Sequence, residues 1–530
     1  MKKKILVSDS LSQEGVEILS NYPDFQVVVK TTMPKEELLE CIGEYDALIV
    51  RSATKVTKEV LQKGKNLKVV GRAGVGVDNV DVDEATRLGI IVMNTPEGNT
   101  TATAELTIGM ILALARHIAQ ADKSTKEGVW EKKKYMGNEV FGKVLGVIGL
   151  GRIGTQVAKK ALGLGMIVMG YDKFKSPELV IKEGIEFAEL EDIYRKADYI
   201  TVHTTLTDET RNMISDEQFN IMKKGVRIIN CARGGIISEE ALIRALETGK
   251  VAGAAIDVFT KEPIEPNHPL VKFPNVILTP HLGASTVEAQ LGVSVAVAKQ
   301  IADALEGKMI VNAVNTPAID PEIKQRIQPF LTLTEKMGKL QSQLLQYRIK
   351  RLTVKTSGEI MEAAIPFLRI AAVKGLLENK YEEMINYVNA LTKAKEAGIE
   401  IIETKSSEIF KYANLITLVI DTEKEKVSVS GTLFSNNDPR IVMINDVFVD
   451  TVPYGNLILC ENDDVPGIIG FVGTLLGNNN INISRMTWGR KGDIGSYAVT
   501  VINVDNEVPR RVLDEITKHK HIRSARLIRL

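Results

Sequence analysis

The chain of 530 residues has little of several things that mark specialised classes of protein. Its three cysteines, Cys41, Cys231 and Cys460, lie far apart, so they form neither a disulfide framework nor a zinc motif, and a reducing compartment is expected. Aromatic residues are only 5% of the chain and the formal net charge is zero. Both values argue against a surface for nucleic acid or for an acidic membrane.

The sequence also has no long apolar run and no secretory pattern at its start. The longest apolar stretch is too short to cross a bilayer, and MKKKILVSDSLSQEG has too few apolar residues for a signal peptide. We therefore expect a cytoplasmic protein with no membrane partner, no nucleic-acid partner and no bound metal.

What the chain does have is a regular alternation of short strands and periodic helical segments, typical of doubly wound α/β sheets. The first strands are expected at KKILVSD, FQVVVK, YDALIVRSAT, LKVVGRAG and GIIVMNTP. One long helix is predicted over residues 102–125. A second α/β unit follows it, with strands at VLGVIG, MIVMGYD, YITVHTT, VRIINCA, AGAAIDVF and NVILTPH, and another helix over 285–305.

The pattern changes after NTPAIDPE, whose two prolines indicate a linker over residues 315–322. Helices and strands continue to VDTVPYGN, which marks a second break. The rest of the chain is expected to form strand, helix, strand, strand, helix and strand, the order of a ferredoxin-like domain.

Residues 149–154 spell G-x-G-x-x-G, with Arg152 and Ile153 between the second and third glycines, after an apolar strand and at the start of a helix. In that context Gly149 makes a tight turn, Gly151 admits a pyrophosphate and Gly154 packs the helix on the strand. The next strand ends at Asp172, whose carboxylate suits ribose hydroxyls and favours NAD over NADP. A glycine-rich turn without a ligand is the alternative.

Several chemically capable side chains follow strand ends, where ligands of open parallel sheets bind. His203 and His281 are both eligible to handle a proton near neutral pH. Asp257 and Glu262 follow the strand before His281, and a carboxylate there is able to hold its imidazole. Arg233 ends the strand of VRIINCARGG, where its charge requires a partner or a cleft.

The segments GLGRIG, NCARGG, DVFTKEP and TPHLGAST resemble, in order and spacing, the D-isomer-specific 2-hydroxy acid dehydrogenases. The resemblance implies that His281 is the general base and acid, that Glu262 orients it, and that Arg233 binds the substrate carboxylate. It implies an NAD site formed by the G-x-G-x-x-G turn and Asp172 with His203, Thr204, Cys231, Ala232, Asp257, Gly283 and Ala284. Many family members have His-x-Pro-Leu where this chain has His203-Thr-Thr-Leu, which leaves the packing of the adenine in question.

The segments RSATKVT, GRAGVGVDNVD and VWEKKKYMG resemble the members of this family that oxidise D-3-phosphoglycerate, at the start of the phosphorylated route to L-serine. The implied substrate-binding residues are Arg51, Ser52, Arg72, Gly74, Val75 and Lys132. Lys132 would complete a neighbouring subunit's site. A solvated charge is the alternative for each cation.

The resemblance covers essentially the whole chain and implies its architecture. A flavodoxin-like substrate domain (1–98 with 286–316) receives an inserted Rossmann NAD domain (99–285), and an intervening α+β domain (317–452) and a ferredoxin-like ACT domain (453–530) follow. ENDDVPGIIGFVG and INISRM resemble the ACT motif, and Asn462, Asp464 and Asn482 match positions that bind L-serine at a domain interface in sensitive relatives. A homo-oligomer is implied, with a dimer through the NAD domain and a tetramer as the expected assembly.

Two other functions stay open at this point. One is a dehydrogenase of the same family acting on glyoxylate, hydroxypyruvate or lactate, against which Arg51, Arg72 and the ACT-like tail argue. The other is a catalytically idle NAD-sensing protein like the corepressors that share the fold, against which the Arg233, Glu262 and His281 set argues.

Overall fold

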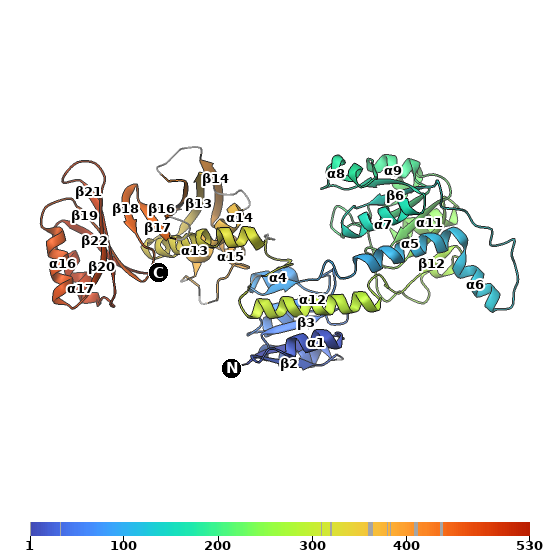
Figure 1. Cartoon of the computed structure of the whole chain (residues 1–530), viewed down its shortest axis with the longest axis horizontal. Helices are drawn as coiled ribbons and strands as arrows, with labels where there is room; N and C mark the ends of the chain where they lie inside the picture. The colour runs from blue at the N-terminus through green and yellow to red at the C-terminus, as the bar shows by residue number, and fades with distance from the viewer. Residues whose placement is uncertain are drawn as a thin grey trace.

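The computed structural model describes residues 2–31, 33–308, 310–317, 321–358, 364–378, 380–381, 383–406, 412–434 and 438–530. Within these residues the chain forms four sheets, each in its own part of the sequence. Figure 1 shows the first sheet near the centre of the molecule, the second at the right and the two C-terminal sheets at the left.

The first domain is a five-stranded parallel sheet in the order β2-β1-β3-β4-β5, which is the flavodoxin-like order. Helices α1 and α12 pack on one face and α2, α3 and α4 on the other, so the strands are buried on both sides. The strands are β1 (Lys3–Val7), β2 (Phe25–Val29), β3 (Ala47–Val50), β4 (Val69–Arg72) and β5 (Ile91–Met93). The helices are α1 (Gln13–Ser20), α2 (Lys35–Cys41), α3 (Lys58–Lys63), α4 (Val82–Arg87) and the distant α12 (Val287–Leu305).

The inserted domain is a seven-stranded parallel sheet in the order β12-β11-β10-β9-β6-β7-β8. The order reverses between β6 and β9, and such a switch point opens a crevice at the carboxyl ends of the strands. The strands are β6 (Val144–Ile148), β7 (Ile167–Tyr171), β8 (Glu186–Phe187), β9 (Tyr199–Val202), β10 (Val226–Asn230), β11 (Val251–Ile256) and β12 (Val276–Leu278). The helices are α5 (Thr100–Arg116), α6 (Ile118–Lys126), α7 (Arg152–Gly163), α8 (Pro177–Lys182), α9 (Leu190–Lys196), α10 (Asp216–Ile221) and α11 (Glu239–Glu247).

The prediction of one long helix over residues 102–125 is wrong. The chain forms α5 and α6, bent by 65° at His117, whose φ of 54° lies in the left-handed region and ends the first helix. Among the described residues, no single helix is long and apolar enough to cross a membrane. The bent pair of α5 and α6 passes that test by length and composition, while α5 belongs to the core of the inserted domain.

The third domain has a mixed six-stranded sheet in the order β14-β13-β15-β16-β17-β18, covered by α13 and α14. The C-terminal domain has an antiparallel sheet in the order β20-β21-β19-β22, and its elements follow the predicted ferredoxin-like sequence. Their bounds are α13 (Pro321–Leu344), β13 (Ile349–Gly358), α14 (Ile365–Leu377), α15 (Ala390–Glu396), β14 (Glu400–Ser406), β15 (Asn414–Thr422), β16 (Lys426–Phe434), β17 (Asp438–Ile444), β18 (Val447–Thr451), β19 (Asn456–Asp463), α16 (Ile468–Asn478), β20 (Ile483–Arg490), β21 (Tyr497–Val504), α17 (Arg510–Thr517) and β22 (Ile522–Arg529).

The two C-terminal domains share one hydrophobic core. Leu457, Leu459, Val499 and Val501 of the C-terminal sheet pack into the core of the third domain, while α16 and α17 cover the opposite face. The four sheets fall inside the four predicted sequence ranges, and the exact boundary residues stay a prediction.

Candidate active site

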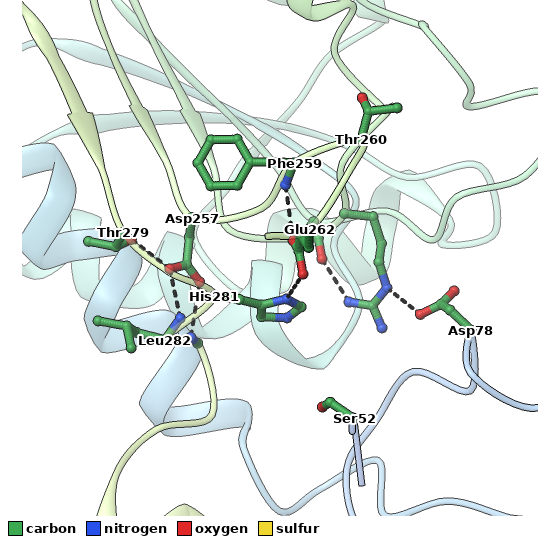
Figure 2. A network of polar contacts seen from close by, with 12 residues as sticks. Ser52, Asp78, Asp257, Phe259, Thr260, Glu262, Thr279, His281 and Leu282 are labelled. Carbon is green, nitrogen blue, oxygen red and sulfur yellow. Dashed lines mark hydrogen bonds and ion pairs between the residues drawn. The ribbon is translucent and has the colours of Figure 1, made fainter. Parts of the chain in front are cut away.

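Three chemically capable side chains follow three adjacent parallel strands of the inserted domain. Arg233 follows β10, Glu262 follows β11 and His281 follows β12. Because the carboxyl ends of parallel strands meet at one edge of a sheet, the three residues lie on the same side. Figure 2 shows Glu262 and His281 there, with Asp78 and Ser52 of the first domain on the opposite side.

His281 and Glu262 form a hydrogen-bonded pair, with 2.8 Å between Nδ1 of the imidazole and Oε2 of the carboxylate. Glu262 also accepts from the Phe259 N–H at 3.0 Å. Burial alone would raise the pKa of Glu262, but these hydrogen bonds and the charge of Arg233 outweigh it and lower that pKa. Since the ionised carboxylate accepts from Nδ1, Nε2 is the ring nitrogen left available for proton exchange.

The backbone under His281 is held in an unusual conformation by Asp257. His281 has a φ of 56°, and its N–H donates to the Asp257 carbonyl at 2.9 Å. The Asp257 carboxylate, which is 0% exposed, accepts from the Thr279 hydroxyl at 2.6 Å, the Leu282 N–H at 2.7 Å and the Gly283 N–H at 3.0 Å. These bonds occupy the carboxylate and support a positioning role for Asp257; direct contact with a cofactor stays a prediction.

The turn that presents Arg233 is closed by the side chain of Asn230. Its amide donates to the Arg233 carbonyl at 2.9 Å and accepts from the Ala232 N–H at 3.0 Å. A Cβ on Gly234 would stand 2.0 Å from the Phe259 carbonyl oxygen, so only glycine lets this turn pack against the loop after β11. Asn230 was not predicted as a site residue, although its place at the end of a strand is a usable signal in the sequence.

Arg233 also reaches the first domain. Its Nε donates to Oδ2 of Asp78 at 3.0 Å, and Figure 2 shows Asp78 and Ser52 approaching from that domain. Asp78 was not predicted as a site residue, although it lies inside the GRAGVGVDNVD segment that carries the resemblance.

The first domain brings the predicted substrate-binding residues Arg51, Ser52, Arg72, Gly74 and Val75 to the strand ends that face Arg233. Arg51 is held by its N–H to Asp9 at 2.6 Å and by its guanidinium to Ser10 at 3.3 Å. Arg72 has one long bond to Ser52 at 3.4 Å, and its buried Nε has no hydrogen-bond partner among the described residues. Burial, with the nearby charge of Arg233, lowers the pKa of Arg72 to about 10. Such a guanidinium is suited to an anionic ligand.

The residues around the G-x-G-x-x-G turn fit a dinucleotide. Gly149 has a φ of 93°, and a Cβ on Gly154 would stand 1.9 Å from the Gly149 carbonyl oxygen, so both positions require glycine. A Cβ on Gly151 would meet nothing within 4 Å, which leaves room at the first turn of α7, where Arg152 and Ile153 offer backbone N–H groups. The Thr204 hydroxyl is buried with no hydrogen-bond partner in the part of the chain that the structure describes.

Asp172 and His203 flank this turn. The Asp172 carboxylate accepts from the Leu150 N–H at 2.8 Å and the Phe174 N–H at 2.8 Å, so it braces the glycine turn while keeping lone pairs for a ribose. The His203 carbonyl oxygen lies 2.7 Å from where a Gly149 Cβ would stand, which places His203 at the switch point.

The remaining predicted cofactor residues lie at neighbouring strand ends. Cys231 is buried with its Sγ 3.4 Å from the Met110 sulfur, and burial raises the pKa of its thiol to about 12, so it is not a reactive thiol. Ala232 is part of the Arg233 turn. Gly283 is fixed by Asp257 and by the Thr103 hydroxyl, which donates to its carbonyl at 2.8 Å, and the Ala284 carbonyl accepts from Gln290 at 3.0 Å.

Four predicted residues, one assigned to the substrate and three to L-serine, do not form a site within one chain. Lys132 is exposed in the segment after α6 and makes none of the described contacts of the cleft.

Asn462 is fully buried and bonded to Thr500 at 3.0 Å, and Asp464 pairs with Arg490 at 2.9 Å. The register places Asn482 at the opposite end of the C-terminal sheet from both. A site containing all three serine-matching residues would need a second copy of the chain.

Acidification is expected to destabilise the inserted domain through His203. Burial lowers the pKa of His203 to about 4, below the ordinary value of 6.5, so the unfolded chain binds the proton first as the pH falls. The free energy of unfolding should therefore drop by about 2 kcal/mol between pH 7 and pH 5 from this residue alone. Thermal unfolding of the wild type and of His203→Gln at both pH values measures this loss of stability. If stability depends on pH equally in the two proteins, His203 is not its source.

Comparisons with known proteins agree with this geometry. Residues 108–283 match the family model described as D-isomer specific 2-hydroxyacid dehydrogenase, NAD binding domain. Residues 326–445 match D-3-phosphoglycerate dehydrogenase intervening domain, and residues 456–521 match ACT domain. The inserted domain is therefore an NAD-binding domain, and NAD is the cofactor of this protein.

Two solved structures resemble the first and inserted domains. The TT0316 protein from Thermus thermophilus is 34% identical with a TM-score of 0.55, covering 59% of this chain and 99% of that one. The D-lactate dehydrogenase from Aquifex aeolicus, complexed with NAD and lactic acid, is 29% identical with a TM-score of 0.51, covering 57% of this chain and 96% of that one.

Relatives of similar length cover all four domains. The chain is 46% identical to the D-3-phosphoglycerate dehydrogenase of Synechocystis sp., covering 99% of this chain and 95% of the relative. It is 44% identical to the D-3-phosphoglycerate dehydrogenase of Archaeoglobus fulgidus, covering 99% of this chain and 100% of the relative. With the NAD, intervening and ACT matches in order along the sequence, this chain belongs to the D-3-phosphoglycerate dehydrogenase family.

Proposed function

We propose that this protein oxidises D-3-phosphoglycerate to 3-phosphohydroxypyruvate with NAD, the first step of the phosphorylated route to L-serine. The observation that carries the proposal is the pairing of His281 with Glu262 at 2.8 Å beside Arg233, opposite Arg51 and Arg72 of the first domain. The pair suits proton transfer and the three arginines suit a substrate that carries both a carboxylate and a phosphate.

The proton of the substrate hydroxyl passes to Nε2 of His281. Glu262, accepting from Nδ1, fixes the orientation of the ring and stabilises the imidazolium that forms. Bound NAD would supply the acceptor for the hydride that leaves the substrate C2 carbon. In the reverse direction the protonated imidazole returns its proton to the carbonyl oxygen.

Arg233 binds the substrate carboxylate and polarises the oxygen at C2. A planar guanidinium matches a carboxylate with two parallel hydrogen bonds, which a lysine ammonium does not reproduce. The Gly74 N–H already donates to the Arg72 carbonyl at 2.9 Å, so in this turn the Val75 N–H is the group proposed to serve the carboxylate. Arg72 and Arg51 are assigned to the phosphate, with Lys132 supplied by a neighbouring subunit.

An NADH assay across 2-hydroxy acids tests the proposal. D-3-phosphoglycerate should be turned over with the highest kcat/KM, ahead of lactate and the reduction of glyoxylate or hydroxypyruvate. Absence of any preference for the phosphorylated substrate would favour another dehydrogenase of the family. Absence of turnover with every acid, while NAD still binds, would favour a non-catalytic NAD sensor.

Removing Arg51 should raise the KM for D-3-phosphoglycerate by about tenfold to a hundredfold, the usual effect of losing a hydrogen bond to a charged group. The KM for an unphosphorylated acid should change little, since only the phosphate loses a partner. Steady-state kinetics of Arg51→Ala measures both values. Lys55→Ala removes an exposed cation from the same loop and serves as the control. An equal rise in both KM values would contradict the assignment.

The assembly and its regulation belong to the same proposal. Trp130, Met136 and Phe141 are 83%, 78% and 75% exposed in the segment after α6, which supports a homo-oligomer formed through the NAD domain, with a tetramer as the full assembly.

L-serine is proposed as an effector at Asn462, Asp464 and Asn482 where two copies meet. No heat of binding in calorimetry with L-serine, together with no inhibition in the NADH assay, would reject serine as an effector.

The three free cysteines support a reducing, cytoplasmic location.

A further inference from the structure

Asp78 contacts the arginine that binds the substrate carboxylate, although it comes from the other domain. We propose that Asp78 is a positioning residue: from the first domain it holds the Arg233 guanidinium of the inserted domain in the orientation that receives the substrate carboxylate. The inference rests on the proposed function, in which Arg233 binds that carboxylate.

The contacts of Arg233 fix its guanidinium along two edges. Nε donates to Oδ2 of Asp78 at 3.0 Å, and Nη1 donates to the Ala232 carbonyl at 2.7 Å. A Cβ on Gly76 would stand 1.8 Å from Nη2, so this nitrogen lies directly against the glycine backbone. The Nη1 and Nη2 edge therefore keeps its remaining N–H groups for a ligand, while Asp78 takes the Nε edge.

The loop that carries Asp78 is itself fixed to the substrate-binding strand ends. The amide of Asn79 donates to the Arg51 carbonyl and to the Thr54 carbonyl, both at 2.7 Å. The amide of Asn94 donates to the Val75 carbonyl at 2.5 Å. Asp78 therefore contacts Arg233 from a loop that is itself fixed, so the loops after β3 and β4 determine where the carboxylate of Asp78 lies against this arginine of the inserted domain.

The charges around Arg233 explain why an acid is needed at this point. Arg72 is close enough for the charge of Arg233 to lower its pKa, and Arg51 acts on it in the same direction. Two guanidinium groups facing each other across a cleft repel, and Asp78 places a negative charge beside one of them. Because the Asp78 side chain is 72% exposed, the ion pair contributes little to folding stability, so its effect is expected in geometry rather than in Tm.

The test compares Asp78→Ala, Asp78→Asn and the control Asp83→Asn in the full chain. Asp83 lies five residues further on, in the first turn of α4, and is not among the contacts of Arg233. We expect Asp78→Ala to raise the KM for D-3-phosphoglycerate by about tenfold to a hundredfold, with a smaller fall in kcat. Asp78→Asn, whose amide oxygen still accepts from Nε, should recover part of the loss. The Tm and the affinity for NADH, measured by fluorescence, should stay unchanged in all three.

Three outcomes would overturn the proposal. Wild-type KM in Asp78→Ala would show that Arg233 needs no such support. A lowered KM would mean that Asp78 competes with the substrate carboxylate for Arg233. A joint loss of Tm and NADH affinity would indicate a structural role only.

The wild-type substrate panel separates this inference from the proposed function. Every 2-hydroxy acid carries the carboxylate that Arg233 is proposed to bind. If the wild type prefers an unphosphorylated acid, the proposed function fails. The Asp78 variants are then measured on that acid, so the positioning role is still tested. An unchanged KM there would defeat the positioning role independently.

Discussion

Replacing His281 with alanine is expected to lower kcat on the order of 10³-fold, because the reaction then lacks the group that accepts the hydroxyl proton. In the proposed mechanism the imidazole transfers the proton, while the backbone of residue 281 is fixed by its N–H, which donates to the Asp257 carbonyl at 2.9 Å and which alanine retains. The affinity for NADH and the Tm should therefore stay close to those of the wild type. Steady-state kinetics measures the loss of kcat, and NADH fluorescence measures whether the affinity for the cofactor is retained.

A second His–Glu pair in the same domain supplies the matched control. His268 contacts Glu239 at 3.1 Å between Nε2 and Oε2, outside the set of contacts around Arg233. His268→Ala removes an equivalent pair and should keep kcat within a few-fold of the wild type. Equal losses in the two variants would mean that the effect of position 281 comes from a general change in the domain.

Replacing Arg233 with alanine is expected to lower kcat/KM on the order of 10³-fold, because in the proposed mechanism one side chain both binds the carboxylate and polarises the reacting oxygen. Lysine at this position should restore little, since a single ammonium cannot make two parallel bonds. Kinetics of both variants with D-3-phosphoglycerate measures the effect.

Arg227 is the matched control on the same strand. It lies at the start of β10, the end away from the cleft, with its guanidinium over the Tyr199 ring at 5.3 Å. Arg227→Ala should alter stability alone. Retention of the wild-type kcat/KM by Arg233→Ala would refute the assignment of the carboxylate to this residue.

The side chains at strand ends could be predicted because topology alone brings them together. Parallel strands end at one edge, so a sequence with Arg233, Glu262 and His281 after three successive strands has them on one side whatever the packing details. Glycine positions were equally accessible, since Gly149 and Gly154 are required by backbone conformation and close approach, both of which leave a local pattern.

Contacts between domains were not predictable in this way. Asp78 and Arg233 are 155 residues apart and meet only because two separately folded bodies pack against each other. The hydrophobic pattern specifies which face of an element is buried, but not which loops of two domains approach. The bend at His117 has a similar origin, because helical periodicity continues across a residue whose left-handed backbone is set by its surroundings.

The return of the chain to its first domain has a consequence for the order of synthesis. Helix α12 packs on α1 and across β3 and β4, where Val293, Val297 and Ile301 complete the core of the first sheet. A nascent chain that has emerged only to residue 286 contains every element of the inserted domain but lacks this helix. Since domains fold as units during translation, the inserted domain is able to complete its fold before the first domain does. Until α12 is made, α1 covers only part of one apolar face of the N-terminal sheet. The rest of that face is therefore exposed during synthesis and not in the mature protein, at the stage when partly folded chains are most prone to aggregate.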